Sequence, residues 1–323
     1  MKSIERVKTM QMEKILLTVI TPVYNGEDYI AETIESVLSL SSDYHFDYVV
    51  VDDGSTDTTW EIVQKYSGKL RSFHQENKGE SAAVNYGINL AFGDYCIIVN
   101  HDDPLFTSEL FVASVKILES DENLVATYPD WILIDKSGEK IEVRQTKEYS
   151  IAELAGFSNC IPGPGACFRK AEALMAGGRN ANYRFVADYD FWLKLSRYGK
   201  FKRISKPLAQ WRLHSNSTSV RNNSLEMALE RIDVISNYLA CNQTTKRFRR
   251  IALSHAYYYA ARLTLSSAGL PGRRFLFKSI WTRKKWPERA NLLVSLAILF
   301  APMSLYFYKR AERFLPARYR IKV

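Results

Sequence analysis

Unbroken apolar runs that end in polar residues recur along the first hundred positions of the chain. They are ILLTVITPVYN at residues 15–25, FDYVVVDDGSTD at 46–57 and YCIIVNHDDP at 95–104. Such runs, rich in β-branched residues, are typical of parallel strands that are covered on both faces. The segments between them carry apolar residues at helical spacing, at 27–40, 57–68 and 79–93. This alternation predicts an α/β fold with a mostly parallel sheet flanked by helices.

The pattern changes after residue 104. The expected elements are then a helix near 107–120, two strands joined by the turn DKSG within 123–142, a Gly/Pro loop at 159–170 that runs into a strand, a helix at 187–200, a loop at 210–219, and helices from about 225 onward. We therefore expect an N-terminal extension over 1–14, one α/β domain over 15–224 with halves 15–106 and 107–224, and a helical extension over 225–323.

Charge is distributed unevenly along the 323 residues. The segment 271–323 holds 13 of the 44 Lys/Arg and only 2 of the 35 Asp/Glu, so the rest of the chain carries 31 basic against 33 acidic residues. The α/β domain thus lacks the basic balance expected of a nucleic-acid-binding protein. The four cysteines form no C-x-x-C pair, and residues 1–14 lack the apolar core of a signal peptide. Both observations favour a reducing, cytoplasmic location.

Three polar clusters follow the predicted strands: TPVYNGE, DDGSTD and NHDD. The carboxyl ends of parallel strands meet at one edge of an open sheet, where ligands bind. The chain has no G-x-G-x-x-G, no G-x-x-x-x-G-K-[ST], no H-E-x-x-H and no G-x-S-x-G motif. A diphosphate could still bind through a divalent cation, because Mg²⁺ combines one or two carboxylates with substrate phosphates and water.

Two pairs of adjacent carboxylates are candidates for this chemistry, and each has a structural alternative. Asp102 and Asp103 could hold a metal ion and a sugar or ribose hydroxyl, or they could form a turn before the next helix. Asp53 could accept a hydrogen bond from a nucleobase on which Tyr24 stacks, within a pocket shaped by the Pro22 loop. Alternatively, Asp53 belongs to a turn and helix cap.

Taken together, these motifs resemble family 2 glycosyltransferases. The resemblance covers residues 15–219 and includes VITPVYNGEDYIAETIESVLSL, YVVVDDGSTDTTWEIV, HQENKGESAAVNYGINLAFGDYCIIVNHDD, ADYDFWLKLSRYGK and QWRLHSNSTS in the expected order and spacing. It implies the GT-A fold and an inverting transfer of a sugar from a nucleotide-diphosphate sugar, UDP-linked in most members, to a hydroxyl acceptor. It also implies Mg²⁺ or Mn²⁺ as cofactor.

The resemblance implies roles for residues at the nucleotide end. Pro22, Tyr24 and Glu27 match the loop that receives the base and ribose, and Asp53 matches the carboxylate that reads the base. The segment beside the donor is matched by Lys78, Gly79, Ser81 and Asn85.

The resemblance also implies a metal site. Asp102 and Asp103 match its acidic motif, with Asp103 expected as the direct ligand and Asp102 assigned to the metal or to the donor sugar. His101 replaces a usually small residue, and the sequence does not explain it. His214 matches a histidine that approaches the metal or diphosphate in some members, accompanied by Arg212. A loop histidine bonded to backbone is the alternative for His214.

Asp188 matches the catalytic base. An acceptor hydroxyl must lose its proton as it attacks the anomeric carbon, and a carboxylate within hydrogen-bond reach can accept that proton. Attack opposite the leaving nucleotide inverts the anomeric centre, and a cation stabilises the departing diphosphate. Asp190 is a rival base, and Asp188 could instead cap the helix that follows.

The basic tail suggests a membrane partner. Residues 290–308 contain no charge and are flanked by cations, and tryptophans and tyrosines lie nearby. This composition favours attachment to the anionic cytoplasmic face of a membrane over a true span, a buried helix or an oligomer contact. A membrane site would suit a lipid-linked glycan acceptor. Other functions remain open alongside the transferase: a catalytically inactive nucleotide-binding scaffold and, less favoured, a sugar nucleotidyltransferase.

Overall fold

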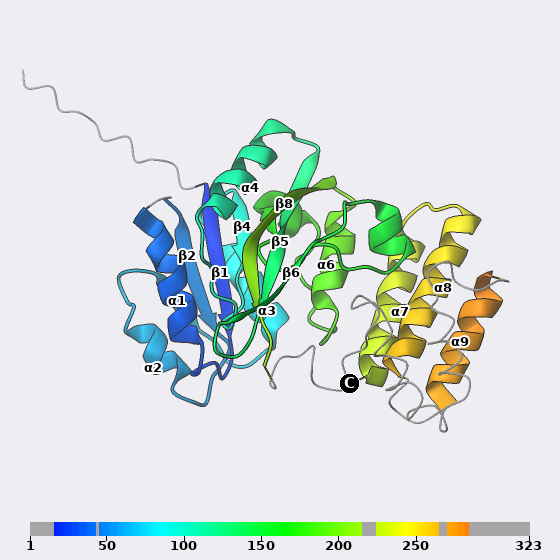
Figure 1. Cartoon of the computed structure of the whole chain (residues 1–323), viewed down its shortest axis with the longest axis horizontal. Coiled ribbons are helices and arrows are strands. Elements are labelled where there is room, and N and C mark those ends of the chain that lie inside the picture. Colours follow the sequence, from blue (N-terminus) through cyan, green and yellow to red (C-terminus); the bar gives the residue numbers. More distant parts are fainter. Residues whose placement is uncertain (1–15, 43–44, 215–223, 265–269, 284–323) are drawn as a thin grey trace, which may run out of the picture.

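The first part of the structure, a computed structural model, is a single mixed sheet with helices on both faces (Figure 1). The structure describes residues 16–42, 45–214, 224–264 and 270–283. Neither the 1–14 extension nor the uncharged 290–308 segment lies within these residues. The strands are β1 (Leu17–Val23), β2 (Asp47–Asp52), β3 (Arg71–His74), β4 (Tyr95–Ile98), β5 (Leu124–Ile134), β6 (Lys140–Arg144), β7 (Cys167–Arg169) and β8 (Lys200–Arg212).

Helices fill the connections and form the C-terminal part of the described chain. They are α1 (Ile30–Ser39), a 3₁₀ turn (Leu40–Ser42), α2 (Thr59–Gln64), α3 (Glu80–Leu90), α4 (Glu109–Ser120), a π-helical turn (Ala152–Gly156), α5 (Lys170–Met175), α6 (Ala187–Leu195), α7 (Ser224–Cys241), α8 (Lys246–Leu263) and α9 (Leu270–Arg283).

The predicted α/β fold with a mostly parallel sheet is confirmed. The strand order is β3-β2-β1-β4-β7-β5-β6, with β8 paired to β5, and β1 runs parallel to both of its neighbours. Every residue of β1 and β2 is buried, as continuous apolar runs require. Successive β1 residues face opposite sides: Val19 packs in the cluster that contains α1, and Ile20 in the cluster that contains α3.

The second half of the sheet departs from the parallel pattern. β7 is antiparallel to both β4 and β5, and β5 and β6 form the predicted hairpin. β8 then returns parallel to β5 and continues to Arg212, which pairs with Ile134. The expectation of a loop from residue 210 was therefore wrong for 210–212, because backbone pairing along β5 extends the strand through these polar residues.

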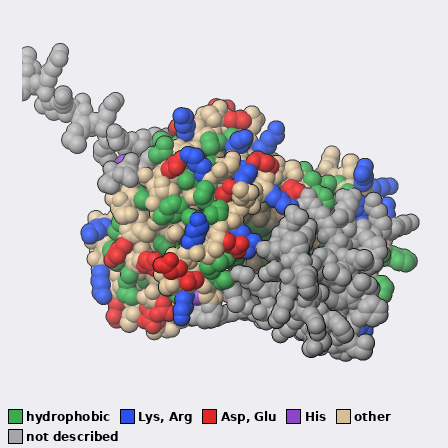
Figure 2. Space-filling model, in the orientation of Figure 1, with side chains coloured by type: hydrophobic (Ala, Val, Ile, Leu, Met, Phe, Trp, Pro, Cys, Tyr) green, Lys and Arg blue, Asp and Glu red, His purple; other side chains and the backbone are tan. Residues whose placement is uncertain are grey.

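Helices α7, α8 and α9 lie side by side at one end of the sheet domain (Figure 1). Val234 and Ile235 of α7 and Ala256 of α8 belong to the same buried cluster as Ile20 and Phe168 of the sheet. The helical extension therefore shares a hydrophobic core with the α/β domain. On the face drawn in Figure 2, acidic side chains gather near α2, and basic side chains are scattered among the others.

Candidate active site

Reciprocal hydrogen bonds join the loop after β1 to the loop after β2. The Asn25 backbone N–H donates to Ser55 Oγ at 2.9 Å, and Asn25 Oδ1 accepts from the backbone N–H of Thr56 at 2.8 Å. Glu27 Oε2 accepts from both the N–H and the hydroxyl of Thr58, at 3.1 and 2.6 Å. Asn25 adopts φ 49°, a left-handed conformation that asparagine tolerates better than most residues. These bonds hold the TPVYNGE and DDGSTD segments together as one platform.

Asp52, the last residue of β2, and Asp53, the residue after it, bind different groups. Asp52 is fully buried, and its carboxylate binds the Ser55 hydroxyl and His74 Nδ1. Asp53 accepts hydrogen bonds from Gln75 Nε2 and from the N–H groups of Lys78 and Gly79, at 2.6, 2.9 and 2.8 Å. A carboxylate offers about four acceptor positions. Asp53, only 2% exposed, therefore fixes the segment that leads into α3, and these three donors leave one acceptor position of its carboxylate unused.

The other predicted nucleotide-binding residues lie along the same edge of the sheet. Pro22 is part of β1, and the Tyr24 ring beyond it is 46% exposed. Lys78 is exposed, while Ser81 is buried in the first turn of α3. Asn85 differs from the expectation of a donor contact: both ends of its amide bind the Arg179 backbone, each at 2.8 Å. Asn85 thus joins α3 to the loop before α6.

Asp102 and Asp103, which follow β4, also bind different groups. Asp102 Oδ2 lies 2.8 Å from His214 Nε2, and both side chains are partly open to solvent. The Asp103 carboxylate is buried and accepts from the Arg212 backbone N–H at 2.8 Å and from Asn100 Nδ2 at 3.1 Å. Burial, together with the neighbouring Asp102 charge, raises the pKa of Asp103 well above its usual range. This geometry favours Asp102, rather than the expected Asp103, as the acid that faces a ligand.

Arg212 holds the loop after β4 in place through its buried side chain. Its side chain is 1% exposed, and its Nε donates to the Asp102 carbonyl at 2.9 Å. Nη2 contacts Glu32 Oε2 at 2.7 Å, and Nη1 donates to the Lys136 carbonyl at 3.1 Å. The guanidinium is therefore engaged by three separate elements. These contacts do not favour the expected substrate-binding role and instead give Arg212 the task of positioning Asp102.

His101, unexplained by the sequence, has a clear structural place. A Cβ built on Gly26 would lie 2.4 Å from the His101 ring, so the ring occupies the space that only glycine leaves free. The His101 carbonyl accepts from the Thr33 hydroxyl of α1 at 2.8 Å. His101 thus packs the loop after β4 against the loop after β1.

The residues at this edge can contribute to a divalent-metal site. Within the described residues, no group of three or more His, Cys, Asp or Glu side chains is arranged to hold a metal. The pair Asp102–His214 offers one oxygen and one nitrogen. A cation bound there would complete its coordination with substrate phosphates and water, as Mg²⁺ and Mn²⁺ do in other nucleotide sites.

The candidate bases on α6 differ in exposure. Asp188 is exposed in the first turn, where its Oδ1 accepts from the N–H of Tyr189 at 2.7 Å. Asp190 is buried, and its carboxylate pairs with Lys194 at 3.0 Å. An acceptor hydroxyl can therefore reach Asp188 more easily than Asp190.

Cys160 lies against Asp188, a neighbour that sequence reasoning missed. Its sulfur is 3.9 Å from Asp188 Oδ2. The Cys160 side chain is exposed, as is that of Asp188. The Gly/Pro composition of residues 159–170 was the only sequence signal for this neighbourhood.

Tyr29, the residue before α1, and Glu32 within α1 were also missed. The Tyr29 ring lies 4.9 Å from the His214 ring and 5.0 Å from the Arg212 guanidinium carbon, while Glu32 binds the same guanidinium. Both lie outside the apolar stripe that identified the helix, and nothing in the sequence links them to residues so far along the chain.

Comparison with known proteins places the chain in a family. The protein family described as glycosyl transferase family 2 matches this chain over residues 18–141. An uncharacterised glycosyltransferase of Rickettsia typhi is 30% identical over 224 residues, which cover 65% of this chain and 68% of that protein. Chondroitin synthase of Escherichia coli is 28% identical over 230 residues, 69% of this chain but 32% of the synthase. The chain thus spans about a third of the length of some relatives.

Solved structures with low sequence identity share the fold. Residues 1–349 of TarS from S. aureus superpose with a TM-score of 0.62 at 18% identity, covering 92% of this chain and 87% of that one. The mannosyltransferase PcManGT from Pyrobaculum calidifontis gives 0.59 at 17% identity, with coverage of 96% and 83%. The fold is therefore of the GT-A type. Together with the sequence matches, these observations show that the chain belongs to glycosyltransferase family 2 and is a glycosyltransferase.

Proposed function

We propose that this enzyme transfers a sugar from a UDP-linked donor to a hydroxyl of a glycan or lipid-linked acceptor, with inversion at the anomeric carbon and a divalent cation as cofactor. The observation that carries the proposal is the pairing of Asp102 with His214 at 2.8 Å, at the sheet edge where the loops after β1, β2 and β4 meet. This pair could bind a metal–diphosphate group. The alternative of an inactive scaffold is not favoured.

The donor would lie along the joined loops. The exposed Tyr24 ring offers a stacking surface for the base, and the remaining acceptor position of Asp53 suits a base N–H. Glu27 would lie near the ribose, and Lys78 and Ser81 beside the phosphates. Related folds support a nucleotide-sugar donor, since TarS has been crystallised with UDP-GlcNAc and PcManGT with GDP-Man and Mn²⁺.

Asp102 and His214 would hold the Mg²⁺ or Mn²⁺ cofactor, and Asp103 and Arg212 would keep Asp102 in place. When bound, the cation would neutralise charge on the departing diphosphate.

Asp188 would act as the general base. Its exposed carboxylate can accept the proton of the acceptor hydroxyl while the oxygen attacks the anomeric carbon. The bond between that carbon and the diphosphate oxygen breaks on the opposite side, so the configuration inverts. The ion pair of Asp190 with Lys194 makes it a poorer candidate for this step.

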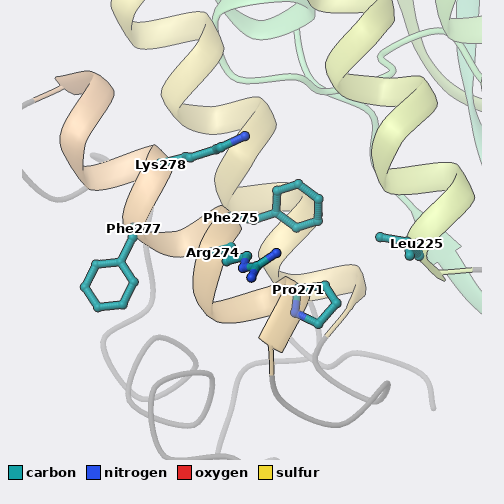
Figure 3. Close-up of a pocket in the computed structure, with 6 residues that line it drawn as sticks. All are labelled: Leu225, Pro271, Arg274, Phe275, Phe277 and Lys278. Carbon is teal, nitrogen blue, oxygen red and sulfur yellow. The ribbon is translucent and has the colours of Figure 1, made fainter.

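The acceptor side would face a membrane. Exposed residues of α9 form one stripe at helical spacing: Arg274, Phe277, Lys278 and Trp281. Figure 3 shows an open pocket beside this stripe, lined by Leu225, Pro271, Arg274, Phe275, Phe277 and Lys278. Aromatic rings among cations suit the interface of an anionic cytoplasmic leaflet. Among the described helices, none has the length and apolar character needed to cross a bilayer.

Calorimetry tests the donor and metal assignments. We expect UDP to bind with Mn²⁺ and to lose about tenfold or more in affinity with EDTA or in Asp102→Asn, since loss even of a group that hydrogen-bonds to a metal ligand typically costs about 10–100-fold. His45→Gln, which changes an exposed histidine on the β1–α1–β2 side, is the control. If UDP affinity changed neither with EDTA nor in Asp102→Asn, the proposed metal-binding role of Asp102 would be contradicted. A screen of nucleotide sugars for hydrolysis would then identify the donor.

A further inference from the structure

Helix α7 holds the segment that carries the proposed base. Both oxygens of the Glu230 carboxylate are engaged, accepting from the N–H groups of Arg184 and Phe185, each at 2.8 Å. The Tyr183 hydroxyl donates to Asp233 Oδ2 at 2.6 Å. Three consecutive residues just before α6 are therefore tied to the helical extension.

Arg231, next to Glu230, extends this contact into α6 itself. The side chain is buried, with the residue only 7% exposed. Its guanidinium carbon lies 4.3 Å from the centre of the Tyr189 ring and 4.0 Å from that of Tyr259 in α8. Nη2 donates to the Ser158 carbonyl. One side chain thus contacts α6, α8 and the loop that leads to Cys160.

Among the described residues, no carboxylate forms an ion pair with Arg231, and its Nε makes no hydrogen bond. A buried cation without such a partner is costly for the fold. Its place against Tyr189, the residue after Asp188, therefore calls for a functional account.

We propose that Arg231 is a positioning residue for the catalytic base: it stacks on Tyr189 and so holds the first turn of α6, which carries Asp188. The helical extension is then part of the active site. This inference rests on the proposed role of Asp188. It assigns a function to α7 that the sequence motifs of the α/β domain do not contain.

Two neutral variants, Arg231→Met and Arg231→Gln, test the proposal in the full-length chain. Glutamine retains a donor for the Ser158 carbonyl. We expect kcat to fall by up to about 10²-fold, because a displacement of about 1 Å of a catalytic group can cost that much, while the KM for the donor stays unchanged. Arg231→Lys keeps the charge but lacks the planar guanidinium that stacks on Tyr189, so it should restore only part of kcat.

The control is Arg249→Met in α8. Arg249 Nη1 also donates to a backbone carbonyl, that of Leu239, and joins α7 to α8 away from the base. Arg249→Met should lower stability without lowering kcat. A folded neutral variant with wild-type kcat would overturn the proposal. If both neutral variants unfold, wild-type kcat in Arg231→Lys would overturn the stacking role.

Asp188→Asn separates this inference from the proposed function. If Asp188→Asn retains transfer, the base assignment itself fails. If it abolishes transfer while the Arg231 variants behave as wild type, only the positioning role fails.

Discussion

The two sides of the active site are assembled in different ways. The nucleotide side consists of loops that follow neighbouring strands and bind one another directly, as Asn25 does with Ser55 and Thr56. The acceptor side combines segments that are far apart in sequence, with Asp188 on α6, Cys160 in a loop and Arg231 on α7. The first is a local structure that parallel-sheet topology brings together, whereas the second depends on how the helical extension packs.

This difference separates binding from catalysis. A single change on the nucleotide side should weaken donor affinity only in part, because several hydrogen bonds hold these loops together. A change on the acceptor side should act on the rate, because in the proposed function one carboxylate, that of Asp188, accepts the proton. The nucleotide side can therefore be tested through the KM for the donor, and the acceptor side through kcat.

The largest expected effect comes from Asp188→Asn. The amide cannot accept the acceptor proton, so kcat should fall by about 10²–10⁴-fold, the usual contribution of a general base. Donor binding measured by calorimetry should not change. Asp190→Asn is the matched control, and we expect it to retain most of the activity. A larger loss of activity in Asp190→Asn would make Asp190 the base, and weaker donor binding in Asp188→Asn would contradict the division between the two sides.

An intermediate effect is expected on the nucleotide side from Asn25→Ala. Alanine removes the bonds to Thr56 and occupies a left-handed backbone at φ 49°, which costs about 1–2 kcal/mol for an ordinary residue. The KM for the donor should rise by up to about tenfold, by the usual relation between free energy and affinity, while kcat changes little. Asn25→Gly relieves the backbone but still lacks the side-chain bonds, and should lie between wild type and Asn25→Ala. A fall in kcat with unchanged donor KM would show that this loop serves catalysis instead.

The smallest expected effect concerns α9. Trp281 is 85% exposed and Phe277 61% exposed on its outer stripe. Trp281→Ala should lower co-sedimentation with anionic vesicles by about fivefold, which corresponds to roughly 1 kcal/mol of lost interfacial contact. Transfer to a soluble acceptor should not change.

Phe92→Ala, an exposed aromatic on the sheet domain, is the control for α9. If Trp281→Ala and Phe92→Ala lost vesicle binding equally, the loss would reflect general instability, and the proposed membrane contact of α9 would not be supported.

Much of the nucleotide side could be predicted before the fold was known. The apolar runs identified β1, β2 and β4, and the polar residues after them indicated the ligand-binding edge. Within each acidic pair, however, the sequence did not decide the roles. Asp102 rather than Asp103 faces His214, because Asp103 turns inward to the Arg212 backbone. The local path of the backbone buries Asp103 and leaves Asp102 partly exposed, and the composition of the segment does not specify that path.

The sequence by itself determined the fold class, the order of the motifs and the kinds of side chain available at the sheet edge. Strand periodicity and turn residues act over a few positions and can be recognised in any single stretch. Only the tertiary structure decided which groups are neighbours across long distances: Glu32 with Arg212, Asn85 with Arg179, and Arg231 with the helix that carries Asp188. These contacts form because hydrophobic burial packs whole helices against the sheet, and that packing fixes where the polar side chains of each helix come to lie.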